Sequence, residues 1–129
     1  MALKVVAPYA AVLAVFYVVL TIRVIRLRYR SRTSLGDGGD ETLRRAIRVH
    51  GNFAEFVPFA LLLISMAEIN GTPFWAIHAL GSLLVLARLS HAYGITQGLE
   101  KLKFRQAGVI GTFIVLIGAA THAVIGAGF

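Results

Sequence analysis

The stretch that decides the fold is residues 48–58, Arg48-Val-His-Gly-Asn52-Phe-Ala-Glu55-Phe-Val-Pro58, which opens a long apolar run ending at Ala67. On a helix, Arg48, Asn52 and Glu55 would stand four and three residues apart and share one face. A carboxylate at the edge of hydrocarbon is costly unless another group compensates it. The stretch therefore predicts a helix that enters a membrane and carries a polar site where its apolar part begins.

Three further apolar stretches complete a set of four. The chain has 129 residues, of which 57% are hydrophobic, and no charged residue occurs in 5–22, 69–87 or 106–129. A helix needs roughly 17–25 residues to cross a bilayer core, so each stretch is long enough. The sequence therefore predicts an all-α fold, a transmembrane four-helix bundle forming a single domain over residues 1–129. The expected helices cover about residues 3–30, 40–69, 73–93 and 100–128.

The positive charge predicts how the helices are oriented. The net charge is +7, and of the 13 lysines and arginines eight lie in residues 23–48 and four in residues 88–105. Because cytoplasmic loops are enriched in such residues, both basic segments are expected in the cytoplasm, with both termini and the turn at 70–72 outward. A signal peptide carries its charge in front of its apolar run, so residues 1–30 are expected to remain as an anchor. A polytopic membrane protein accounts for the basic clusters, so no nucleic-acid partner is expected.

Short polar signals mark the helix ends. Asp40 is expected to cap the second helix, with Glu41 beside the positive end of the helix dipole. Thr72 is expected to cap the third helix, with Pro73 as its first helical residue. Gly94 is expected to end that helix. These signals give the expected bounds of the two central helices.

Arg48, Asn52 and Glu55 have two chemical interpretations. Arginine can hold a carboxylate with two hydrogen bonds, glutamate can accept from an ammonium, and asparagine can do either, which would suit a zwitterionic ligand. Alternatively, Arg48 and Glu55 form an internal ion pair that only lowers the cost of burial. Side-chain chemistry alone leaves both interpretations open.

Four other positions could take part in chemistry. Arg88, His91 and Tyr93 are expected at the cytoplasmic end of the third helix, either as a charged helix end or, for His91, as a general base. Arg105, at the start of the fourth helix, is either a flanking charge or a group that stabilises a thiolate or another developing anion. The chain has no cysteine, so any thiol must arrive with a ligand. No metal-binding motif is visible in the sequence.

The motif Arg48-x3-Asn52-x2-Glu55-Phe56-x-Pro58 resembles the signature of the MAPEG superfamily, the membrane-associated proteins in eicosanoid and glutathione metabolism. Two segments are similar to its bacterial branch, namely Leu35-Gly-Asp-Gly-Gly-Asp40 and Ala87-Arg88-Leu-Ser-His91-Ala-Tyr93-Gly94. The opening of the fourth helix, Arg105-Gln-Ala-Gly108, agrees as well. The resemblance covers nearly the whole chain.

The resemblance implies a homotrimer in a bacterial inner membrane, with glutathione bound as co-substrate between neighbouring protomers. The residues that would bind it, carried over by position, are Arg28, Arg48, Asn52, Glu55, Arg88, His91 and Tyr93. Arg105 would be the catalytic residue that stabilises the glutathione thiolate. The implied activity is that of a glutathione transferase or glutathione-dependent peroxidase acting on a lipophilic second substrate, with no metal.

Three positions depart from the eicosanoid-pathway members. Phe56 and His91 stand where such members often have tyrosines, and Gly51 falls where prostaglandin-E synthases have an arginine. A specialised eicosanoid synthase is therefore not expected. Two other functions stay open. One is a non-catalytic scaffold whose basic loops bind anionic membrane lipids, and the other is a small transporter with Glu55 as its coupling carboxylate.

Overall fold

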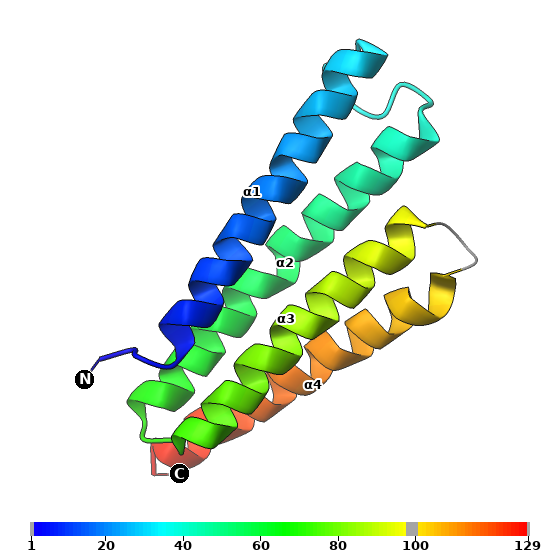
Figure 1. Ribbon diagram of the computed structural model, residues 1–129. Coiled ribbons are helices and arrows are strands. Elements are labelled where there is room, and N and C mark those ends of the chain that lie inside the picture. The colour runs from blue at the N-terminus through cyan, green and yellow to red at the C-terminus, as the bar shows by residue number, and fades with distance from the viewer. Residues whose placement is uncertain (1, 98–100, 129) are drawn as a thin grey trace.

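The computed structural model describes residues 2–97 and 101–128, which form a bundle of four helices (Figure 1). These are α1 (Val6–Ser31), α2 (Glu41–Ile69), α3 (Phe74–Thr96) and α4 (Leu102–Gly126). Successive helices run in opposite directions, so α1 begins and α4 ends beside the α2–α3 turn. The all-α prediction is confirmed, while the expected start of the last helix at residue 100 lies outside the described residues.

All four helices are long and apolar enough to cross a membrane. Their outward faces carry large hydrophobic side chains that the bundle leaves exposed, among them Val15, Ile114 and Ile117. Large exposed apolar surface is unfavourable in water but suits contact with lipid hydrocarbon. The four predicted transmembrane segments are therefore present as four separate helices with the surface that a bilayer requires.

The interior of the bundle packs aliphatic side chains from every helix. Leu13, Val49, Ile64, Leu84 and Val115 are all fully buried. Among the residues that the structure describes, four buried ones are polar or charged, namely Asn52, Arg88, His91 and Thr112. A buried polar group is costly unless it is hydrogen-bonded, so each of these four side chains needs a hydrogen-bond partner.

The predicted cap of α2 is confirmed. Asp40 Oδ1 accepts hydrogen bonds from the backbone N–H groups of Thr42 (2.9 Å) and Leu43 (3.1 Å). Glu41 occupies the first turn, where the helix dipole favours a negative charge. The short loop after α1 therefore leads into a helix start at which Asp40 pairs two of the free N–H groups.

The predicted start of α3 is wrong by one residue. The N-cap is Pro73, whose ψ of 138° keeps it outside the helix, and no side chain caps this end. The backbone N–H of Thr72 donates to the carbonyl of Ala67 instead, at 3.1 Å. Thr72 thus belongs to the turn that closes α2, and the fixed φ of proline positions the first helical residue, Phe74.

The predicted end of α3 at Gly94 is also wrong, because the helix continues to Thr96. Gly94 lies against the backbone of Arg105 in α4, and a β-carbon on Gly94 would overlap it. Gly108 makes a similar close approach to His91 from the other helix. Glycine inside a helix costs roughly 1 kcal/mol relative to alanine, so it is found where close packing requires it. Here the two glycines let α3 and α4 approach each other closely.

Glu68 of α2 fixes where α1 begins. Its carboxylate accepts hydrogen bonds from the backbone N–H groups of Val5 and Val6, each at 2.8 Å. The first N–H groups of a helix have no partner within the helix, and a negative charge beside them is favourable. This contact explains why α1 starts at Val6 rather than near residue 3, and it joins α1 to α2 at the end where the chain begins.

Candidate functional site

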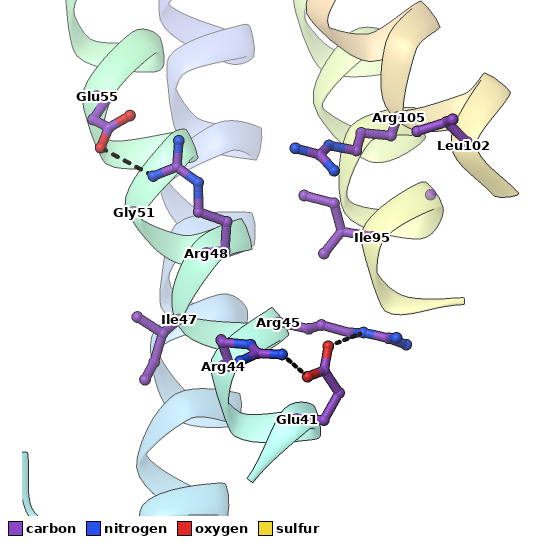
Figure 2. A pocket seen from close by; sticks show the side chains of 11 residues that line it. Glu41, Arg44, Arg45, Ile47, Arg48, Gly51, Glu55, Ile95, Leu102 and Arg105 are labelled. Atoms are coloured by element: carbon purple, nitrogen blue, oxygen red, sulfur yellow. Dashed lines mark hydrogen bonds and ion pairs between the residues drawn. The ribbon is translucent and has the colours of Figure 1, made fainter. Parts of the chain in front are cut away.

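A cavity of about 740 Å³ opens at the end of the bundle that carries the α1–α2 loop. α2 forms one wall, and the end of α3 with the start of α4 forms the other (Figure 2). Its lining consists of Glu41, Arg44, Arg45, Ile47, Arg48, Gly51, Glu55, Gly94, Ile95, Leu102 and Arg105. Four arginines and two glutamates among these residues make the cavity highly charged in an otherwise apolar protein.

Arg48 and Glu55 lie on the α2 wall and face each other. Arg48 Nη1 is 3.5 Å from Glu55 Oε1, two helical turns along α2. The two side chains are 58% and 56% exposed, so this is an accessible ion pair rather than a buried one. Both members of the pair can therefore exchange their partner for a ligand without being extracted from the core.

Arg105 lies on the opposite wall. Figure 2 shows its side chain extending from α4 across the cavity toward α2. It is 50 residues from Glu55 in sequence, and the packing of the start of α4 against the end of α3 brings it to the same cavity. The structure therefore brings together three of the predicted site residues, Arg48, Glu55 and Arg105.

Three further charged residues on the first turns of α2 line the cavity and were not predicted as site residues. Glu41 forms ion pairs with Arg44 and, at 3.1 Å, with Arg45. Arg44 and Arg45 precede Arg48 by four and three residues, which is one helical turn. That spacing was the signal in the sequence that could have identified them.

Asn52 is not among the residues that line the cavity. It is only 7% exposed, and its Oδ1 accepts a hydrogen bond from Arg88 Nη2 at 2.6 Å. Of the three residues expected to share one face of α2, Arg48 and Glu55 line the cavity. Asn52 lies at the inner edge of that face, in contact with α3. Sequence spacing fixed the face but not which of its edges the neighbouring helix would cover.

Arg88 and His91 lie together inside the bundle rather than on the cavity wall. Arg88 is 1% exposed, and its Nη2 also lies 3.3 Å from His91 Nδ1. Its Nη1 is 3.4 Å from the hydroxyl of Thr112, a buried α4 residue that sequence reasoning missed. Nothing distinguishes Thr112 in the sequence from any other hydroxyl in an apolar helix.

Tyr93 and Arg28 lie outside the cavity. The Tyr93 ring is edge-on to Phe104, with the Lys101 ammonium 6.0 Å from its centre. Arg28 donates a 2.7 Å hydrogen bond to the carbonyl of Gly36 and lines a separate hollow at the end of α1. Within a single chain, neither residue reaches Arg48, Glu55 or Arg105.

No metal centre competes for this site in residues 2–97 and 101–128. These residues contain no group of three His, Asp or Glu side chains placed to hold a metal ion. His50 and His78 instead form hydrogen bonds to side chains of α1. His50 bonds to Thr21 at 3.0 Å and His78 to Tyr9 at 2.8 Å. The arginines and glutamates that line the cavity are suited to binding ionic organic groups.

Four membrane-length helices with a charged cavity at one end define a multi-pass membrane protein. The chain belongs to the MAPEG family, whose sequence model matches residues 6–125 and confirms the resemblance noted above. It is also 37% identical over 111 residues to the inner membrane protein YecN of Escherichia coli K12, over 86% of this chain and 83% of that protein. The inner membrane protein YecN of E. coli O6:H1 matches to the same extent.

Proposed function

We propose that the protein binds glutathione in the charged cavity and uses it as co-substrate for reactions of apolar electrophiles in a bacterial inner membrane. The observation that carries the proposal is that Arg48, Glu55 and Arg105 line one cavity from opposite walls. Membership of a family linked to glutathione metabolism supports the choice of ligand. The relative described as an inner membrane protein supports the location.

The charges of the cavity complement those of glutathione, which has two carboxylates, one ammonium and one thiol. Arginines bind carboxylates through paired hydrogen bonds, and four arginines are available. Glu55 can accept from the ammonium once it releases Arg48. Exposed ion pairs contribute only about 0–1 kcal/mol, so replacing this pair by two ligand contacts costs little.

Arg105 is the residue proposed to activate the thiol. A free thiol ionises near pH ~8.5, and neighbouring cations can lower this to roughly 3.5–7.5. An arginine remains charged throughout this range, so it stabilises the thiolate without itself titrating. The thiolate is the nucleophile, which makes the position of Arg105 the determinant of reactivity.

The proposal includes a homotrimer with glutathione between protomers. Arg28 lies in a separate hollow of its own chain, so it could contribute only to the cavity of a neighbouring protomer. The exposed apolar faces of the helices provide surface for such neighbours and for lipid. A lipophilic second substrate would reach the cavity from the bilayer.

Ultraviolet difference spectra of the purified protein with glutathione test the site. At neutral pH the wild type should show thiolate absorption, and Arg105→Ala should abolish it. Lys103→Ala is the matched control, because Lys103 precedes Arg105 by two residues and does not line the cavity. Absence of binding by the wild type at millimolar glutathione would refute the proposal.

Product analysis distinguishes the two activities. In a transfer reaction with an aryl halide, the thiolate sulfur bonds to the ring carbon, the carbon–halogen bond breaks, and the products are a thioether and a halide ion. In a peroxidase reaction two glutathione molecules are oxidised to the disulfide while a hydroperoxide is reduced to an alcohol and water. Proteoliposomes supplied with an apolar aryl halide or a lipid hydroperoxide should yield one of these products, and both should be lost in Arg105→Ala.

A further inference from the structure

A polar cluster is buried directly behind the cavity wall. Its members are Asn52 of α2, Arg88 and His91 of α3, and Thr112 of α4. Asn52 follows Gly51 in α2, and His91 lies one turn before Gly94 in α3, and both glycines line the cavity. The cluster is therefore placed to influence the cavity although a different set of residues forms its surface.

Arg88 is the centre of this cluster. Its Nη2 lies 2.6 Å from Asn52 Oδ1 and 3.3 Å from His91 Nδ1, and its Nη1 lies 3.4 Å from Thr112 Oγ1. A guanidinium has five N–H donors and no acceptor. Every polar atom that contacts it must therefore accept. Thr112 can do so because its own hydroxyl proton is donated to the carbonyl of Gly108 at 2.8 Å.

The contact with Arg88 determines the protonation of His91. Because Nδ1 accepts from Nη2, that ring nitrogen must carry a lone pair rather than a proton. A neutral imidazole then has its single proton on Nε2, which makes Nε2 a donor. His91 in this arrangement cannot act as a general base through Nδ1, in contrast to the role considered from the sequence.

The same contact determines the orientation of Asn52. An asparagine amide has one acceptor oxygen and one donor NH₂ group, and Arg88 occupies the oxygen at 2.6 Å. Flipping the amide would place two sets of N–H donors against each other. The group that Asn52 retains for any other partner is therefore its Nδ2 donor.

We propose that Arg88 is a positioning residue that fixes the amide orientation of Asn52 and the Nε2–H tautomer of His91, so that both can only donate to a ligand. This step rests on the proposed function where it concerns glutathione. Any glutathione atom that hydrogen-bonds to Asn52 or His91 must then be an acceptor, namely a carboxylate or carbonyl oxygen or the thiolate sulfur. The ammonium is directed to Glu55.

The charge of the cluster favours the same ligand groups. Among the described residues, no carboxylate forms an ion pair with Arg88, and its Nε has no hydrogen-bond partner. A buried cation without a counter-ion raises the local potential and attracts an anion. The N–H donors and the positive potential therefore both favour ligand groups that accept hydrogen bonds and carry a negative charge at this side of the cavity.

Nitrogen NMR of the full-length protein tests the tautomer without any ligand. The chain has four histidines, so selective ¹⁵N labelling gives few signals, and His91 is assigned by its absence in His91→Gln. At neutral pH the His91 ring should carry one proton, on Nε2. A proton on Nδ1, in the other tautomer or in an imidazolium, would overturn the assignment.

Two variants test whether Arg88 is the cause. Arg88→Met keeps an unbranched side chain but removes all donors, so His91 should lose its single tautomer. Thr112→Val removes the third partner of Arg88 and should leave the His91 signal unchanged. A folded Arg88→Met protein with the wild-type tautomer would contradict the proposal. If that variant does not fold, the wild-type measurement still decides which tautomer His91 has, and a proton on Nδ1 would overturn the proposal.

Asn52→Asp separates the two roles of Asn52. The carboxylate still accepts from Arg88 but has no N–H to offer a ligand. The fold should be retained, while glutathione binds at least about tenfold more weakly, because one hydrogen bond is lost and the added negative charge repels the anionic groups of the ligand. Unchanged affinity would overturn the donor role of Asn52. Failure of the wild type to bind glutathione would refute the proposed function but leave the tautomer result intact.

Discussion

Gly94 of α3 lies so close to the backbone of Arg105 in α4 that a β-carbon on Gly94 would overlap it. Both residues line the charged cavity. Their contact therefore sets how closely α4 approaches α3 at this end of the bundle. It also sets the position from which the Arg105 guanidinium crosses the cavity toward α2.

Gly94→Ala should displace the start of α4 and destabilise the protein by about 1–3 kcal/mol, the usual cost of overpacking. Thiolate absorption of bound glutathione should fall as well, because Arg105 moves with α4. Thermal unfolding and ultraviolet difference spectra provide the two measurements. Gly51→Ala is the stability control, since a β-carbon there meets nothing within 4 Å. An unaltered melting temperature in Gly94→Ala would contradict the packing argument.

Glu55→Gln should separate ligand binding from stability. The Arg48–Glu55 pair is exposed, so its loss should change the free energy of unfolding by less than about 1 kcal/mol. Glutathione should bind at least about tenfold more weakly, because a charge-assisted hydrogen bond to its ammonium is removed. Isothermal titration calorimetry measures the affinity. Glutathione acylated on its amine has no ammonium, so it should bind wild type and variant equally. Tighter binding to the wild type would show that Glu55 does not act through the ammonium.

Glu68→Gln should loosen the start of α1. The change removes the charge and one of two acceptors for the N–H groups of Val5 and Val6, at a cost of about 1–3 kcal/mol. Hydrogen exchange at those two amides should accelerate. Glutathione affinity should stay at the wild-type value, because Glu68 lies in the last turn of α2 whereas the cavity is lined by residues 41–55 of that helix. Glu41→Gln, which alters an exposed ion-pair network, serves as the control for exchange at α1.

The orientation in the membrane can be measured with introduced cysteines, since the chain has none. Thr72→Cys, in the α2–α3 turn, should react with a membrane-impermeant maleimide in intact spheroplasts. Ser34→Cys, in the basic α1–α2 loop, should react only after permeabilisation, as the positive-inside rule requires. The reverse pattern would place the charged cavity on the periplasmic side, away from cytoplasmic glutathione.

Local sequence signals predicted the parts of the fold that depend on neighbouring residues. Asp40 caps α2 because its side chain needs only the N–H groups two and three residues later. Thr72 and Gly94 were misassigned because each resembles a helix-end signal. Their actual roles are set by Pro73 in one case and by the α4 backbone in the other.

The sequence by itself determined four membrane-length helices and a polar face on the second one, because hydropathy and helical spacing are properties of contiguous residues. Only the tertiary structure decided that Asn52 turns inward to Arg88 while Arg105 shares a cavity with Glu55. These relationships join side chains of different helices. Packing between helices sets which faces meet, and spacing along one helix carries no information about its neighbour.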